Sequence, residues 1–155
     1  MKKVIGVFLI FALLLTGCGY HTPQEKQEDE KKHSKLELYS AQDEELLQTI
    51  DHQDTVHKLL NTSDWEVIEG ISDDLQPEYI MLVYQEKTLL YGQDPDEERD
   101  YELIATVITY QNSPYIKEII SSTVIKNMTV PENALTFYYA MPDDIQEDLH
   151  ELIDE

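Results

Sequence analysis

The chain has 155 residues, with 32 acidic and 11 basic side chains, and its formal net charge at pH 7 is −21. A field of this sign repels phosphate groups, which argues against nucleic acid as a partner and favours cationic partners. The chain has one cysteine, so an internal disulfide is excluded. A length of this order suits one domain rather than two.

The first eighteen residues have the three parts of an export signal. Residues 1–3 are cationic at Lys2 and Lys3, residues 4–15 form an apolar run broken by Gly6, and small residues follow up to Cys18. The run is shorter than the ~20 apolar residues that a membrane-spanning helix needs. The pattern therefore predicts a secretory signal peptide over residues 1–17.

The end of this signal is more specific than an ordinary cleavage site. Leu15-Thr16-Gly17-Cys18 resembles the lipobox of bacterial lipoproteins, in which the cysteine is lipidated and becomes the new N-terminus. The resemblance covers the first eighteen residues and implies a lipid anchor on Cys18 at the outer, extracytoplasmic face of the cell membrane. Two acyl chains suffice for stable anchoring. The overall composition is similar to that of small lipoproteins of low-GC Gram-positive bacteria.

Composition divides the remaining chain into two parts. Residues 19–35 contain no aliphatic side chain and mix four acidic residues with four lysines, so residues 18–35 are expected to be a flexible, lipidated stalk. Residues 36–155 carry 28 acidic side chains against five basic ones, a formal charge of −23. We expect these residues to form a single acidic domain.

Two helices are expected at the ends of this domain. Ser40-Ala41-Gln42-Asp43 has the form of a capping box, and apolar residues recur at near-helical spacing from there to about Leu60. At the other end, Pro142 precedes residues 143–154, where Ile145, Leu149 and Leu152 form one stripe among acidic residues. Proline before an acidic first turn is typical of a helix start.

Strands are expected between the two helices. Apolar, β-branched and aromatic runs, separated by turn residues such as Asn112-Ser113-Pro114, cover residues 65–68, 78–85, 101–110, 115–126 and 135–140. Short connections without helices favour antiparallel pairing. The predicted fold class is therefore α+β: an N-terminal helix packed on an antiparallel meander of four or five strands, followed by a short C-terminal helix.

Few residues indicate specific chemistry. The domain has no G-x-S-x-G, H-E-x-x-H or glycine-rich phosphate motif. The densest acidic group lies in residues 94–100, where Asp94, Asp96 and Glu98 superficially resemble a calcium loop. The sixth and twelfth positions that an EF-hand needs as Gly and Glu are Arg99 and Ala105 here. A solvated loop in which Arg99 neutralises its neighbours is expected, with a weak, millimolar Ca²⁺ site as the alternative.

Three classes of function remain open. We favour a non-catalytic accessory lipoprotein that binds a cationic or other extracytoplasmic protein through a sheet face or an acidic edge, without a cofactor. The first alternative is a small-ligand sensor or carrier with a pocket between the N-terminal helix and the sheet, lined by aromatic residues such as Tyr84, Tyr101 and Tyr110. The second is a hydrolase that uses a carboxylate pair in a cleft.

The lipid anchor predicts the behaviour of a single substitution. Cys18→Ala removes the sulfur that accepts the lipid, so labelling with a radioactive fatty acid should disappear and the variant should remain uncleaved at this site. Metabolic labelling followed by gel electrophoresis of the membrane fraction measures both. Unchanged membrane retention of the variant would contradict the predicted anchor.

Overall fold

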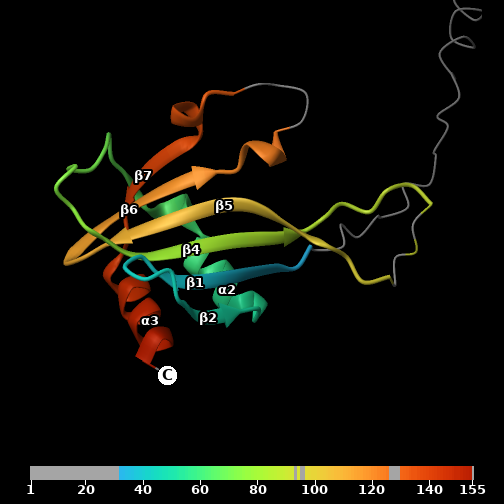
Figure 1. Ribbon diagram of the computed structural model, residues 1–155, viewed down its shortest axis with the longest axis horizontal. Helices are drawn as coiled ribbons and strands as arrows, with labels where there is room; N and C mark the ends of the chain where they lie inside the picture. Colours follow the sequence, from blue (N-terminus) through green and yellow to red (C-terminus); the bar gives the residue numbers. More distant parts are fainter. Residues whose placement is uncertain (1–31, 93, 95–96, 126–129, 155) are drawn as a thin grey trace, which may run out of the picture. The chain divides into compact units, whose positions relative to one another are not determined.

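The computed structural model describes residues 32–155, except 93, 95–96, 126–129 and 155 (Figure 1). The predicted signal peptide, Cys18 and residues 19–31 of the predicted stalk lie outside the described residues. In the described part of the chain, no helix is both long enough and apolar enough to span a membrane. The elements are β1 (Ser34–Ser40), β2 (Leu46–Ile50), α2 (Gln53–Leu60), β3 (Glu66–Val67), β4 (Pro77–Glu86), β5 (Tyr101–Tyr110), β6 (Ser113–Ile120), β7 (Thr136–Ala140) and α3 (Asp143–Asp154), with three short 3₁₀ turns.

The strands form one seven-stranded sheet in the order β2-β1-β4-β5-β6-β7-β3, and all neighbouring pairs are antiparallel. β4 to β7 form the predicted meander. The α+β class, the antiparallel pairing and the C-terminal helix over residues 143–154 are confirmed. The strand number of four or five is wrong, because β1 and β2 extend the sheet beyond β4.

The predicted helix from Ser40 to Leu60 is wrong over its first half. Ser40 ends β1, and a tight turn leads into β2, with Ser40 N–H donating to the Glu45 carbonyl (2.9 Å). The Ser40 hydroxyl accepts from Gln42 N–H at 3.3 Å inside this turn, which is a local bond that competes with helix capping. Glu44 has a φ of 58°, which reverses the chain direction. Only residues 53–60 are helical.

β1 begins at Ser34, within the range assigned to the stalk. Its side chains alternate: Leu36 and Leu38 are fully buried, whereas Lys35 and Glu37 point to the other face. Apolar and charged residues alternate over only a few positions here, so the sequence alone does not distinguish this segment from the polar stalk. Pairing with β2 and β4 makes it a strand. β1 therefore includes two residues that composition assigned to the stalk, and His33 before it also pairs with Glu86 of β4.

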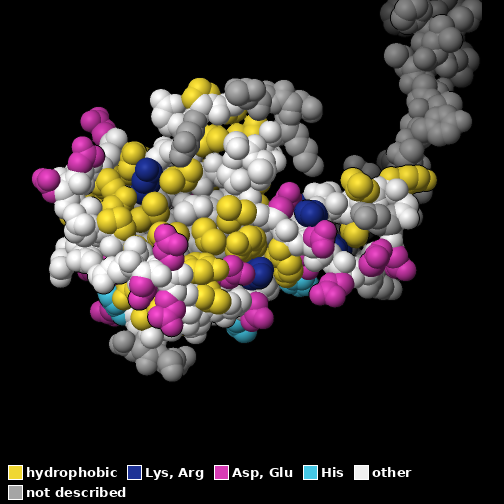
Figure 2. Space-filling model, in the orientation of Figure 1, with side chains coloured by type: hydrophobic (Ala, Val, Ile, Leu, Met, Phe, Trp, Pro, Cys, Tyr) yellow, Lys and Arg dark blue, Asp and Glu magenta, His cyan; other side chains and the backbone are white. Residues whose placement is uncertain are grey.

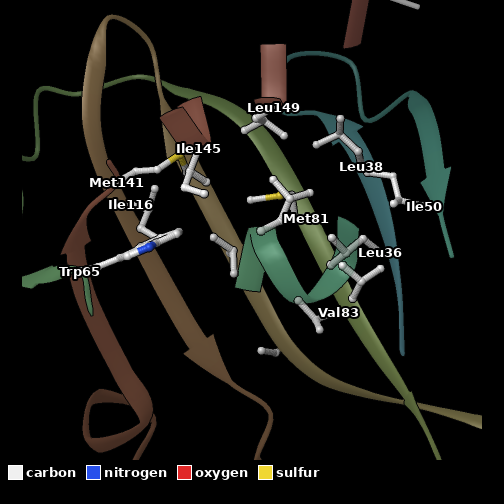
Figure 3. Close-up of a cluster of buried hydrophobic side chains, with 14 residues drawn as sticks. Leu36, Leu38, Ile50, Trp65, Met81, Val83, Ile116, Met141, Ile145 and Leu149 are labelled. Atoms are coloured by element: carbon white, nitrogen blue, oxygen red, sulfur yellow. The ribbon is translucent and has the colours of Figure 1, made fainter. Parts of the chain in front are cut away.

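Both helices lie on the same face of the sheet and complete one hydrophobic core (Figure 3). The sheet contributes alternate residues such as Leu38, Met81 and Val107. The helices contribute Val56 and Leu59 from α2, and Ile145 and Leu149 from α3, at the i, i+3 and i, i+4 spacings of an amphipathic helix. Trp65, before β3, packs edge-on against Tyr139 of β7, with 6.3 Å between ring centroids.

The core predicts a large difference between two leucines on neighbouring strands. Leu38 is fully buried and Leu46 is 48% exposed. Leu38→Ala should lower the free energy of unfolding by about 2–5 kcal/mol, because it leaves a cavity in a packed interior, whereas Leu46→Ala should cost less than about 1 kcal/mol. Urea titration followed by Trp65 fluorescence measures both. Similar losses for the two variants would contradict this assignment of the core.

Candidate functional site: the open face of the sheet

The helices cover one face of the sheet, and no described helix lies on the other. We call this second surface the open face. Side chains reach it from the strand positions that alternate with the core positions: Ile80 and Leu82 flank Met81, and Ile108 follows Val107. Its half-buried members are Lys35, Glu37, Tyr39, Ile80, Leu82, Tyr84, Leu103, Thr106, Ile108, Lys117, Ile119 and Tyr138.

The centre of the open face is apolar. Cross-strand register places Ile80 beside Ile108, and Leu82 beside Thr106, which in turn pairs with Ile119. Figure 2 shows hydrophobic side chains gathered over the middle of the sheet. Apolar side chains that meet on one exposed surface differ from scattered surface leucines, because a contiguous patch is typical of an interaction surface.

One end of the open face is organised around an ion pair. The Lys35 ammonium lies 2.9 Å from the Glu37 carboxylate, and it also lies 5.0 Å and 5.4 Å from the ring centroids of Tyr84 and Tyr101. The Tyr39 hydroxyl donates to Glu37 at 3.0 Å. The hydrogen bond from Lys35 is the main reason why the pKa of Glu37 is lowered, so the carboxylate stays charged and paired at neutral pH.

Acidic loops flank the open face at both ends of its strands. At the end where β4 begins, Glu69, Asp73 and Asp74 are exposed, and the exposed turn of residues 43–45 lies at the same end, since Ala41 N–H donates to the Glu78 carbonyl. At the other end, Asp94, Glu97, Glu98 and Asp100 are exposed in the β4–β5 loop. Figure 2 shows acidic side chains toward both ends.

The calcium alternative remains a prediction. Asp94 and Glu98 are exposed, and Asp96 lies outside the described residues. Across the residues that the structure describes, no three His, Cys, Asp or Glu side chains converge on one point. Arg99 reaches out of the loop to β4, where its Nη1 lies 3.5 Å from Glu86 Oε2. His33 also binds Glu86, and these partners together outweigh burial and lower the pKa of Glu86.

The aromatic residues suggested for a ligand pocket do not meet between a helix and the sheet. Tyr84 and Tyr101 approach Lys35 on the open face, whereas Tyr110 is buried beside a cavity of about 30 Å³ near α3. Fourteen buried side chains fill the space between the helices and the sheet. A larger depression of about 330 Å³ lies between α2 and α3, and the ion pair of Lys58 and Asp148 lines it.

Glu118 is the one described carboxyl group whose pKa is raised. It lies on the helix side of β6, between Val107 and Phe137 in register, and is half-buried. Burial raises the pKa of Glu118, and a hydrogen bond from Tyr139 opposes this shift without cancelling it. A catalytic pair needs a second carboxylate or another proton carrier. The neighbour found here is the Tyr139 hydroxyl, whose own pKa is raised, mainly by burial.

Comparisons of the chain with known protein families, with curated proteins and with solved structures give no match. Among the described residues, the open face is the main candidate for a functional site, because its apolar side chains adjoin one another and no described helix covers them. The sequence contained one signal for it. Residues 79–84 are apolar or aromatic at successive positions, the pattern of a strand buried on both faces, while only two helical patterns were available to cover the sheet.

The raised pKa of Glu118 predicts a pH-dependent effect on stability. A carboxyl whose pKa is higher in the folded state than in the unfolded state favours folding when protonated, and this contribution is lost as pH rises through the folded pKa. Glu118→Gln should therefore raise the melting temperature at pH 7–8, and the gain should shrink toward pH 4. Glu147→Gln on the exposed side of α3 controls for the lower net charge. Equal gains from the two variants at pH 7–8 would contradict a specific role of burial at Glu118.

Proposed function

We propose that the protein is a lipid-anchored, non-catalytic lipoprotein that binds another extracytoplasmic protein through the open face. The anchor rests on the signal and lipobox residues that end at Cys18. The binding role rests on one observation above all: a seven-stranded sheet presents a contiguous apolar surface that no described helix covers.

The energetics favour a protein as the partner. A sheet face gains stability when a second layer of structure removes its apolar side chains from water, at roughly 25 cal/mol per Å² buried. β4 and β5 have ten residues each, so the face is about 33 Å long at ~3.3 Å per residue. Surfaces of this size match the ~800 Å² that each partner contributes to a standard protein interface, and exceed what a small ligand covers.

The charge of the domain supports the same partner class. Residues 36–155 carry a formal charge of −23, and the acidic loops at both ends of the strands place part of this charge beside the open face. Such a field accelerates encounter with a basic surface and repels acidic ones. We infer a partner whose surface is basic around an apolar contact area.

Photo-crosslinking from the two faces tests this function. A benzophenone amino acid replaces Leu82 on the open face or, as the control, His57, which is exposed on α2. The tethered full-length protein is irradiated in membranes of the organism that produces it. We expect a crosslink to another protein from position 82, and its loss when Ile80 and Ile108 are both changed to Thr, which keeps β-branching and reduces apolar area.

The control pair is Val67→Thr with Phe137→Thr, two exposed apolar residues on β3 and β7. Register places them on the helix side of the sheet, opposite Tyr139 and Glu118. This pair should leave the crosslink unchanged, and thermal unfolding checks that both pairs remain folded. Crosslinks from position 57 alone, or none from either position, would contradict the proposed use of the open face.

A further inference from the structure

Lys117 differs from the other cations of the domain. Among the described residues from 33 to 125, it is the one Lys or Arg side chain without a carboxylate partner. The others form ion pairs: Lys35 with Glu37, Lys58 with Asp148, Lys87 with Asp100, and Arg99 with Glu86. In a chain with almost three acidic residues for each basic one, an unpaired lysine is unexpected.

Lys117 lies within the apolar part of the open face. Register places it between Ile108 of β5 and Tyr138 of β7, and Ile119 is its next neighbour on the same side of β6. The side chain is half-buried by these neighbours. The carboxylates that register places on this face, Glu37 on β1, Glu86 on β4 and Glu66 on β3, are two or three strands away, or at least about 10–15 Å at ~4.8 Å per strand.

A partner that covers the open face must also remove Lys117 from water. Burying a charge without a counter-ion is strongly unfavourable, whereas a hydrogen-bonded carboxylate offsets much of that penalty. Because the described part of the chain places no carboxylate near enough, we infer that the partner provides one. An apolar partner surface without an acidic group would bind weakly here.

A second copy of this chain fits poorly. In any aligned packing of two open faces, the acidic loops at the strand ends of one copy would lie against those of the other, and like charges repel. Each copy would also bring its own Lys117. The charge pattern therefore favours a different protein.

We propose that the open face recognises a protein surface with a carboxylate at its centre, and that this carboxylate pairs with Lys117. This inference rests on the proposed function. Apolar side chains surround this carboxylate, and Lys or Arg side chains toward the edges meet the acidic loops. In charge, this partner surface is the reverse of the open face, which has a lysine within its apolar centre and acidic residues at its ends. Lys117 is then the residue that selects the partner, and Ile80, Leu82, Ile108 and Ile119 supply the buried area.

The test uses the tethered full-length protein with the benzophenone at position 82 and compares four substitutions. Lys117→Glu should lower the crosslink yield at limiting partner by at least about tenfold, because two carboxylates would meet in a desolvated contact. Lys117→Met should lower it by a smaller factor, and Lys117→Arg, which keeps the charge, should stay within about threefold of wild type. Lys58→Glu on α2 makes the same change in net charge away from the open face and should have no effect.

Sequencing of the crosslinked peptide completes the test. An Asp or Glu close to the crosslinked residue, together with the dependence on charge at Lys117, would support the proposal. A crosslink from position 82 that Lys117→Glu leaves unchanged, a contact peptide without an acidic residue, or a crosslink to a second copy would overturn it. The first two of these outcomes leave the proposed function standing, whereas the absence of any crosslink from the open face removes both.

Discussion

The structure depends on one constraint: the helices of the described residues are long enough to cover one face of the sheet and not both. Seven strands present two broad faces, and the α-helices of the described residues are one of 8 residues and one of 12. Both helices pack on the same side, where their leucines and isoleucines meet Leu36, Leu38, Met81 and Val107 in one continuous core. Concentrating the helices gives one well-packed layer, because a helix stripe and a sheet face stabilise each other only where they are in contact. The consequence is a second face that no described helix covers.

That second face is built to stay in water until something covers it. Its charged residues interrupt the apolar centre, and the Lys35–Glu37 pair with its surrounding tyrosine rings occupies one end. Long side chains such as Lys117 lay their aliphatic stems on apolar neighbours and keep the ammonium in solvent. Together with the strongly acidic loops, these features oppose self-association, since a large net charge of one sign keeps molecules apart. The same features would make an interface selective for a partner with the complementary charge pattern.

Glu118 and Lys117 show how much one step along a strand matters. They are neighbours in β6 and point to opposite faces. Glu118 lies on the helix side, where burial raises its pKa and Tyr139 is its hydrogen-bonding neighbour. Lys117 lies on the open face, where solvent still reaches it. A shift of strand register by one residue would exchange their environments, so the pairing of β5, β6 and β7 determines which of the two charges a partner meets.

The sequence by itself determined the α+β class, the meander from β4 to β7, and the C-terminal helix, because each depends on a local pattern of hydrophobicity or on turn residues. The export signal that it predicts lies outside the described residues. It did not determine β1 and β2: Leu46, Leu47 and Ile50 fit a helical spacing as well as a strand, and only pairing with β1 decides between them. Nor could it choose which side of β4 is the core, since Ile80 and Leu82 are as apolar as Met81 and Val83. The tertiary structure decided that choice by placing α2 and α3 on one side. Burial depends on which elements meet in space. For a strand that is apolar on both faces, the sequence pattern does not indicate which face the helices cover.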